Sequence, residues 1–105
     1  MDNATLERFE KLLAGGQDSA LLRFTLGKGY LELGRTDQAL EHLNAAVALQ
    51  SDYTAAWKLL GKAREAQDDV ASAAEAYKRG IEAAQANGDK QLEREMGVFL
   101  KRLDR

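Results

Sequence analysis

The chain has 105 residues, of which 45% are hydrophobic and 30% are charged, and its 15 basic and 17 acidic side chains give a net charge of −2. This composition is ordinary for one folded domain and argues against a disordered chain. The absence of cysteine excludes disulfides and thiolate metal sites. The acidic balance and the lack of a long apolar run mean that neither nucleic acid nor a membrane is expected as a partner.

Helical periodicity predicts six helices and no strands. Apolar side chains recur at spacings of three and four residues, as in Leu22, Leu26, Tyr30 and Leu33, while a period of two is not sustained anywhere. The chain contains no proline to interrupt such a pattern. The expected helices cover residues 3–14, 19–33, 36–49, 53–66, 70–86 and 89–103.

Short breaks separate these segments. Gly15–Gly16 and Gly34 can end helices in the left-handed conformation that glycine adopts easily. Asp18 or Ser19 is expected to cap the second helix, and Ser51–Asp52 the fourth. Connections this short predict that consecutive helices pack antiparallel.

The same residue types recur along much of the chain at a constant spacing of about 34 residues, the length of a helical repeat unit. Leu26 and Gly27 align with Leu60 and Gly61, Ala39 with Ala73, and Leu43 with Tyr77. Copied units of this length stack into a solenoid, in which each unit contacts its neighbours. Such an architecture favours a binding or assembly surface over an enzyme pocket.

The repeated unit resembles the tetratricopeptide repeat, a helix–turn–helix pattern of this same length. The second copy carries its signature as Trp57, Leu60, Gly61, Ala73 and Tyr77, whereas the first copy has Arg23 in place of the tryptophan. The resemblance implies an all-α solenoid of antiparallel helix pairs. Gly27 and Gly61 are then expected where two helices come closest.

The repeat frame also extends to both ends of the chain. Thr5, Phe9 and Leu12 lie one repeat length before Ala39, Leu43 and Ala46. If one residue is inserted, Leu92, Met96 and Phe99 take the tryptophan, glycine and tyrosine sites of a third repeat. We therefore predict a half repeat at 3–19, full repeats at 20–53 and 54–87, and a capping helix at 88–105.

The family's first helices line a concave groove that generally holds peptide ligands. Carried over to this sequence, the groove residues are Leu21, Phe24, Lys28 and Leu31 on the second helix and Lys58, Lys62 and Glu65 on the fourth. The spacing of Phe24, Lys28 and Leu31 independently places them on one helical face. The prediction is a module that binds a short, acidic or C-terminal peptide of another protein through its lysines and apolar side chains.

Two other interpretations remain open. The lysines can be ordinary solvated surface, with Phe24 and Leu21 packed beneath the first helix. Alternatively, the chain can be an assembly module that forms homo-oligomers through its amphipathic last helix, although a monomer is favoured over a dimer. The carboxylate clamp that some family members use for chaperone peptides is absent, since Phe24 and Lys28 occupy its lysine and asparagine sites.

No residue pattern points to catalysis, a metal or a cofactor. His42 is the only histidine, and it is expected on the outer surface of its helix. Asp68–Asp69 is interpreted as a loop and helix cap, because catalytic carboxylate pairs need contrasting environments. The N-terminus lacks the basic and apolar regions of a signal peptide, so a cytoplasmic location is expected.

Overall fold

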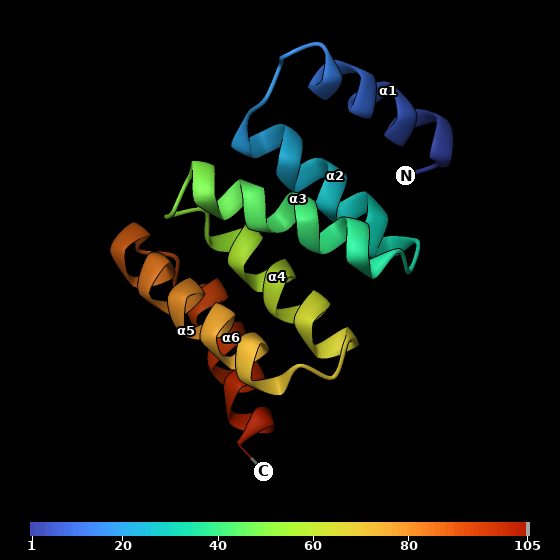
Figure 1. The fold of residues 1–105 in the computed structure, drawn as a ribbon. Helices are drawn as coiled ribbons and strands as arrows, with labels where there is room; N and C mark the ends of the chain where they lie inside the picture. Colours follow the sequence, from blue (N-terminus) through green and yellow to red (C-terminus); the bar gives the residue numbers. More distant parts are fainter. Residues whose placement is uncertain (105) are drawn as a thin grey trace.

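The computed structural model describes residues 1–104, which form six α-helices and no strand. The helices are α1 (Asn3–Ala14), α2 (Ala20–Glu32), α3 (Thr36–Leu49), α4 (Thr54–Ala66), α5 (Val70–Asn87) and α6 (Lys90–Leu103). They stack in chain order, with α1 at one end of the molecule and α6 at the other (Figure 1). The expected all-α helical solenoid is confirmed.

Side-chain caps and glycines fix most helix boundaries as expected. The Ser19 hydroxyl accepts a hydrogen bond from the Leu22 amide, and the Asp69 carboxylate accepts one from the Ser72 amide. Gly34 adopts a φ of 75°, which glycine tolerates. The prediction that Ser51–Asp52 caps α4 is wrong: these residues form the preceding turn, and the Ser51 carbonyl accepts from the Trp57 indole at 2.8 Å.

Inner and outer helices alternate along the stack. The backbones of the inner helices α2, α4 and α6 approach one another in sequence, whereas the backbones of the outer helices α1, α3 and α5 do not do so within residues 1–104. The stack is therefore closer together on its inner side. The inner helices line the concave side that the repeat predicts.

Two glycines allow α2 to lie directly on α3 and α4 to lie directly on α5. A Cβ at Gly27 would lie 2.6 Å from Leu43 Cγ, and a Cβ at Gly61 would overlap the Tyr77 ring. Both glycines have ordinary helical geometry, so the need for glycine is one of space. The expected close approach of the helices at Gly27 and Gly61 is confirmed.

The last helix follows the repeat with a different register from the predicted one. Met96 is completely buried and packs on Gly80, whereas a Cβ at Gly97 would meet nothing within 4 Å. Met96–Gly97 therefore corresponds to Leu60–Gly61, which requires an insertion of two residues instead of one. The extra length lies in α5, which has 18 residues where α3 has 14.

Candidate functional site

The predicted residues of α2 differ in how far they are exposed to solvent. Leu21 is 66% exposed, and Lys28 is also exposed. Phe24 is half-buried and stacks on Tyr53, with ring centroids 4.9 Å apart and an interplanar angle of 27°. Leu31 is half-buried against the core. This half of the site thus offers an apolar surface beside a solvent-exposed ammonium group.

The predicted residues of α4 interact with neighbouring helices. Lys58 Nζ lies 2.7 Å from Glu95 Oε2 on α6, and Lys62 Nζ lies 5.2 Å from the centroid of the Phe99 ring. Glu65 accepts a hydrogen bond from the Tyr77 hydroxyl on α5. Lys62 remains exposed, whereas Lys58 and Glu65 are half-buried.

These contacts change the proton affinity of two groups. The hydrogen bond from Lys58, helped by its charge, holds the pKa of Glu95 below its ordinary value. Burial, followed by the bond to Glu65, raises the pKa of the Tyr77 hydroxyl. Both shifts favour the protonation states in which these hydrogen bonds form.

Two residues of this surface were not predicted from sequence. Tyr53 directly precedes α4, and its ring stacks on that of Phe24. This contact joins Phe24 of α2 to the start of α4. Glu95 reaches Lys58 across 37 residues of sequence. The Tyr53 aromatic next to a helix start was a usable signal, but Glu95 could be placed only with the corrected register of α6.

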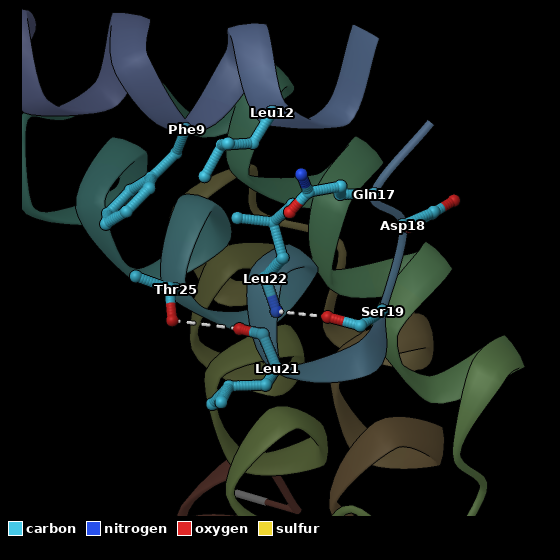
Figure 2. Close-up of a pocket in the computed structure, with 8 residues that line it drawn as sticks. All are labelled: Phe9, Leu12, Gln17, Asp18, Ser19, Leu21, Leu22 and Thr25. Atoms are coloured by element: carbon cyan, nitrogen blue, oxygen red, sulfur yellow. Dashed lines mark hydrogen bonds between the residues drawn. The ribbon is translucent and has the colours of Figure 1, made fainter. Parts of the chain in front are cut away.

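Apart from the predicted groove, a pocket lies between α1 and α2, at the end of the stack. This pocket has a volume of about 460 Å³ and is lined by Phe9, Leu12, Gln17, Asp18, Ser19, Leu21, Leu22 and Thr25. Figure 2 shows Phe9 and Leu12 descending from α1 toward Leu22 on α2. Its walls are mainly apolar, with the Ser19 hydroxyl occupied as the cap of α2.

The expectation that His42 lies on the surface is wrong, because its side chain enters a polar cluster between α1, α2 and α3. His42 is only 4% exposed, and its ring stacks on Tyr30. Arg23 Nη1 lies 3.2 Å from His42 Nδ1, and Glu10 Oε1 lies 2.7 Å from His42 Nε2. Since Arg23 can only donate, Nδ1 accepts and Nε2 carries the proton that bonds Glu10.

Arg23 is held in this cluster by Asp18. Its guanidinium donates to both carboxylate oxygens of Asp18, at 2.9 and 3.1 Å. The hydrogen bonds lower the pKa of Asp18 and raise that of Arg23. Arg23, which stands where the repeat has tryptophan, and the buried His42 therefore form one polar cluster. The arginine at the tryptophan position was the sequence signal for this cluster.

Groups suited to other chemistry do not assemble in the described structure. Within residues 1–104, no three side chains of histidine, cysteine, aspartate or glutamate come together as a metal site. None of the helices over the same residues has the length and apolar character needed to cross a membrane.

The repeat geometry agrees with the comparison of the sequence with known families. The sequence profile described as tetratricopeptide repeat matches residues 24–88, which is more than half of the chain. The chain belongs to the tetratricopeptide repeat family. Domains of this family are generally protein–protein interaction modules.

Relatives resemble this tetratricopeptide repeat chain over most of its length. A TPR repeat-containing protein of Pseudomonas aeruginosa is 54% identical over 100 residues, which cover 95% of each chain. A solution structure of a Bordetella parapertussis protein has a TM-score of 0.81 and 49% identity, covering 94% of this chain and 86% of that one. The crystal structure of the Aspergillus fumigatus Sgt2 TPR domain has a TM-score of 0.79 and 27% identity. The match covers 92% of this chain and 64% of that one.

Proposed function

We propose that the concave side of α2 and α4 binds a short, acidic segment of another protein. The observation that carries this proposal is the exposure of Leu21 and Lys28 beside the Phe24–Tyr53 stack. The stack gives a rigid apolar platform for one side chain of the peptide. Lys28, one helical turn from Phe24, supplies a charge that can pair with a carboxylate.

The two predicted halves of the groove have different roles in this proposal. Lys28 and Lys62 are exposed, so a peptide carboxylate can reach either without displacing a protein carboxylate. Lys58 already pairs with Glu95, and a ligand would have to replace that partner. We therefore assign peptide contact to Leu21, Phe24, Lys28 and Leu31 together with Lys62. Lys58 and Glu65 have a structural role instead, because they bond to Glu95 of α6 and Tyr77 of α5.

A ligand in this groove is short and weakly held. Neighbouring helices lie ~9 Å apart, so the three inner helices span ~20–30 Å, or roughly six to nine extended residues. Exposed lysines are screened by salt, so affinity should fall as ionic strength rises. A free C-terminal carboxylate adds one more charge for the lysines.

Fluorescence anisotropy with labelled acidic peptides tests the proposal. Each acidic peptide contains one aromatic or aliphatic residue. A neutral control peptide has the same sequence with every Asp replaced by Asn and every Glu by Gln. The acidic form should bind more tightly, and Lys28→Glu should weaken it about five- to tenfold. The matched control is Lys78→Glu, an exposed lysine on the outer helix α5. Equal binding of the two peptides, or equal effects of the two variants, overturns the proposal.

A further inference from the structure

The two ends of the stack carry complementary halves of a helix pair. Within residues 1–104, α1 is an outer helix without an inner helix on its exposed face, and α6 is an inner helix without an outer partner. We infer that α6 of one molecule seats α1 of a second copy of this chain, so that the two halves form a helix pair between molecules. This self-association goes beyond the proposed peptide binding and departs from the monomer favoured by the sequence.

The seat on α6 is centred on Gly97. With the two added residues taken into account, Gly27, Gly61 and Gly97 occupy the same position in three successive repeats. A Cβ at Gly27 would meet Leu43 and a Cβ at Gly61 would meet Tyr77, both on the outer helix of the same pair. At Gly97 that space is open. Glycine in a helix interior is unfavourable by itself, which agrees with a position kept clear for an incoming helix.

The exposed face of α1 carries the side chains that such a seat would receive. Phe9 and Leu12 lie one repeat length before Leu43 and Ala46, which are completely buried under α2 and α4. On α1 the same positions are less buried: Phe9 packs half-buried against the core, and Leu12 is 41% exposed. Phe9 therefore takes the place opposite Gly97 that Leu43 takes opposite Gly27.

Charge complementarity selects a second copy as the occupant. Within the first pair, Arg23 on the inner helix contacts His42 on the outer helix at 3.2 Å. The residues at the equivalent positions are Glu93 on α6 and Arg8 on α1. Seating α1 on α6 with this geometry places opposite charges together. Both residues are accessible for it, since Arg8 is exposed and Glu93 is half-buried.

Apolar groups at both ends extend the contact beyond the helix pair. An inner helix also packs on the next inner helix, as Lys62 of α4 does on Phe99 of α6. A second copy's α6 seated on α1 would in the same way approach α2, where Leu21 and Thr25 line the pocket of Figure 2. On α6, Val98 stands at the repeat position of Lys62 and is 56% exposed.

The interface joins different surfaces of the two molecules, so each copy keeps one free end. Association of this kind produces a growing chain of molecules instead of stopping at a dimer. Lys28 does not take part in the contact. A failure of peptide binding through Lys28 and a failure of self-association are therefore separate results.

Sedimentation velocity over a concentration series of the whole chain tests the inference. The weight-average mass should rise with concentration and continue past the dimer. Gly97→Leu should give a monomer at every concentration, because its side chain fills the seat while the fold has open space for it. Lys78→Leu, which adds the same side chain to the outer helix α5, should associate like the wild type. A wild-type chain that remains monomeric, or equal association of the two variants, overturns the inference.

A mixing experiment identifies which surfaces meet. Leu12→Glu blocks the α1 face and leaves α6 free, whereas Gly97→Leu does the reverse. Each alone should be monomeric, and an equimolar mixture should form one heterodimer. If Leu12→Glu alone still forms a dimer, two α6 helices pair symmetrically and the inference is wrong. In the same assay Arg8→Glu and Glu93→Arg should each weaken association, and their combination in one chain should restore it; no restoration contradicts the assigned pairing.

Discussion

The imidazole Nε2 of His42 on α3 lies 2.7 Å from the carboxylate of Glu10 on α1. This contact joins two outer helices whose backbones do not otherwise approach. The same Glu10 oxygen also accepts a hydrogen bond from the Tyr30 hydroxyl at 3.2 Å. The half repeat is therefore attached to the stack by a polar contact in addition to the buried Leu6, which packs close to Gly29.

Replacing Glu10 by alanine should loosen this attachment. The substitution leaves the N–H of a buried imidazole without its acceptor, so the free energy of unfolding should fall by about 1–3 kcal/mol. Urea denaturation followed by circular dichroism measures the change. Glu7→Ala, at an exposed position of the same helix, is the control and should change stability by less than about 0.5 kcal/mol. Equal effects would show that the Glu10–His42 contact contributes nothing.

Arg23 and His42 should behave as a coupled pair. In the second repeat the equivalent residues are Trp57 and Ala76, both buried. Arg23→Trp alone places an indole against the imidazole, and His42→Ala alone leaves a cavity beside Arg23. The double variant recreates the pairing of the second repeat, so its loss of stability should be smaller than the sum by about 0.5–3 kcal/mol. Additive losses in a double-mutant cycle would contradict this.

Alanine should have opposite effects at two glycines of the inner helices. Gly61→Ala places a methyl group against the Tyr77 ring and should lower the free energy of unfolding by about 1–3 kcal/mol. Gly97→Ala meets no atom, so the gain in helix propensity should raise it by about 0.5–1 kcal/mol. Chemical denaturation at a concentration where each variant is monomeric compares them. The same sign at both positions would rule out the spatial explanation.

The Lys58–Glu95 pair should make stability depend on acidity. The pKa of Glu95 is lowered in the folded state, so its contribution is present above the ordinary pKa of 4.5 and is lost as the pH falls through the folded value. Glu95→Gln should therefore lower the melting temperature near about pH 7, and the difference should disappear by about pH 2–3. Glu75→Gln, in the exposed pair with Arg79, is the control. A difference that persists in acid would exclude this ion pair as its cause.

The helices were predictable because their signals are local. Apolar spacing, the Ser19 and Asp69 caps and Gly34 act within a few residues of the chain, and the observed helices agree with the expected ones within one residue at each end. The close approach at Gly27 and Gly61 was also predictable, since a repeated glycine inside a helix has few other physical causes. The register of α6 was not, because the two added residues extend α5 without breaking its helical pattern.

The sequence by itself determined the repeat, the helices and their arrangement in antiparallel pairs. Only the tertiary structure decided which charged groups already have partners: Glu95 holds Lys58, and Glu10 with Arg23 holds His42. The reason is physical. Helix periodicity is a property of neighbours in the chain, whereas burial and charge pairing depend on side chains that come together from distant helices.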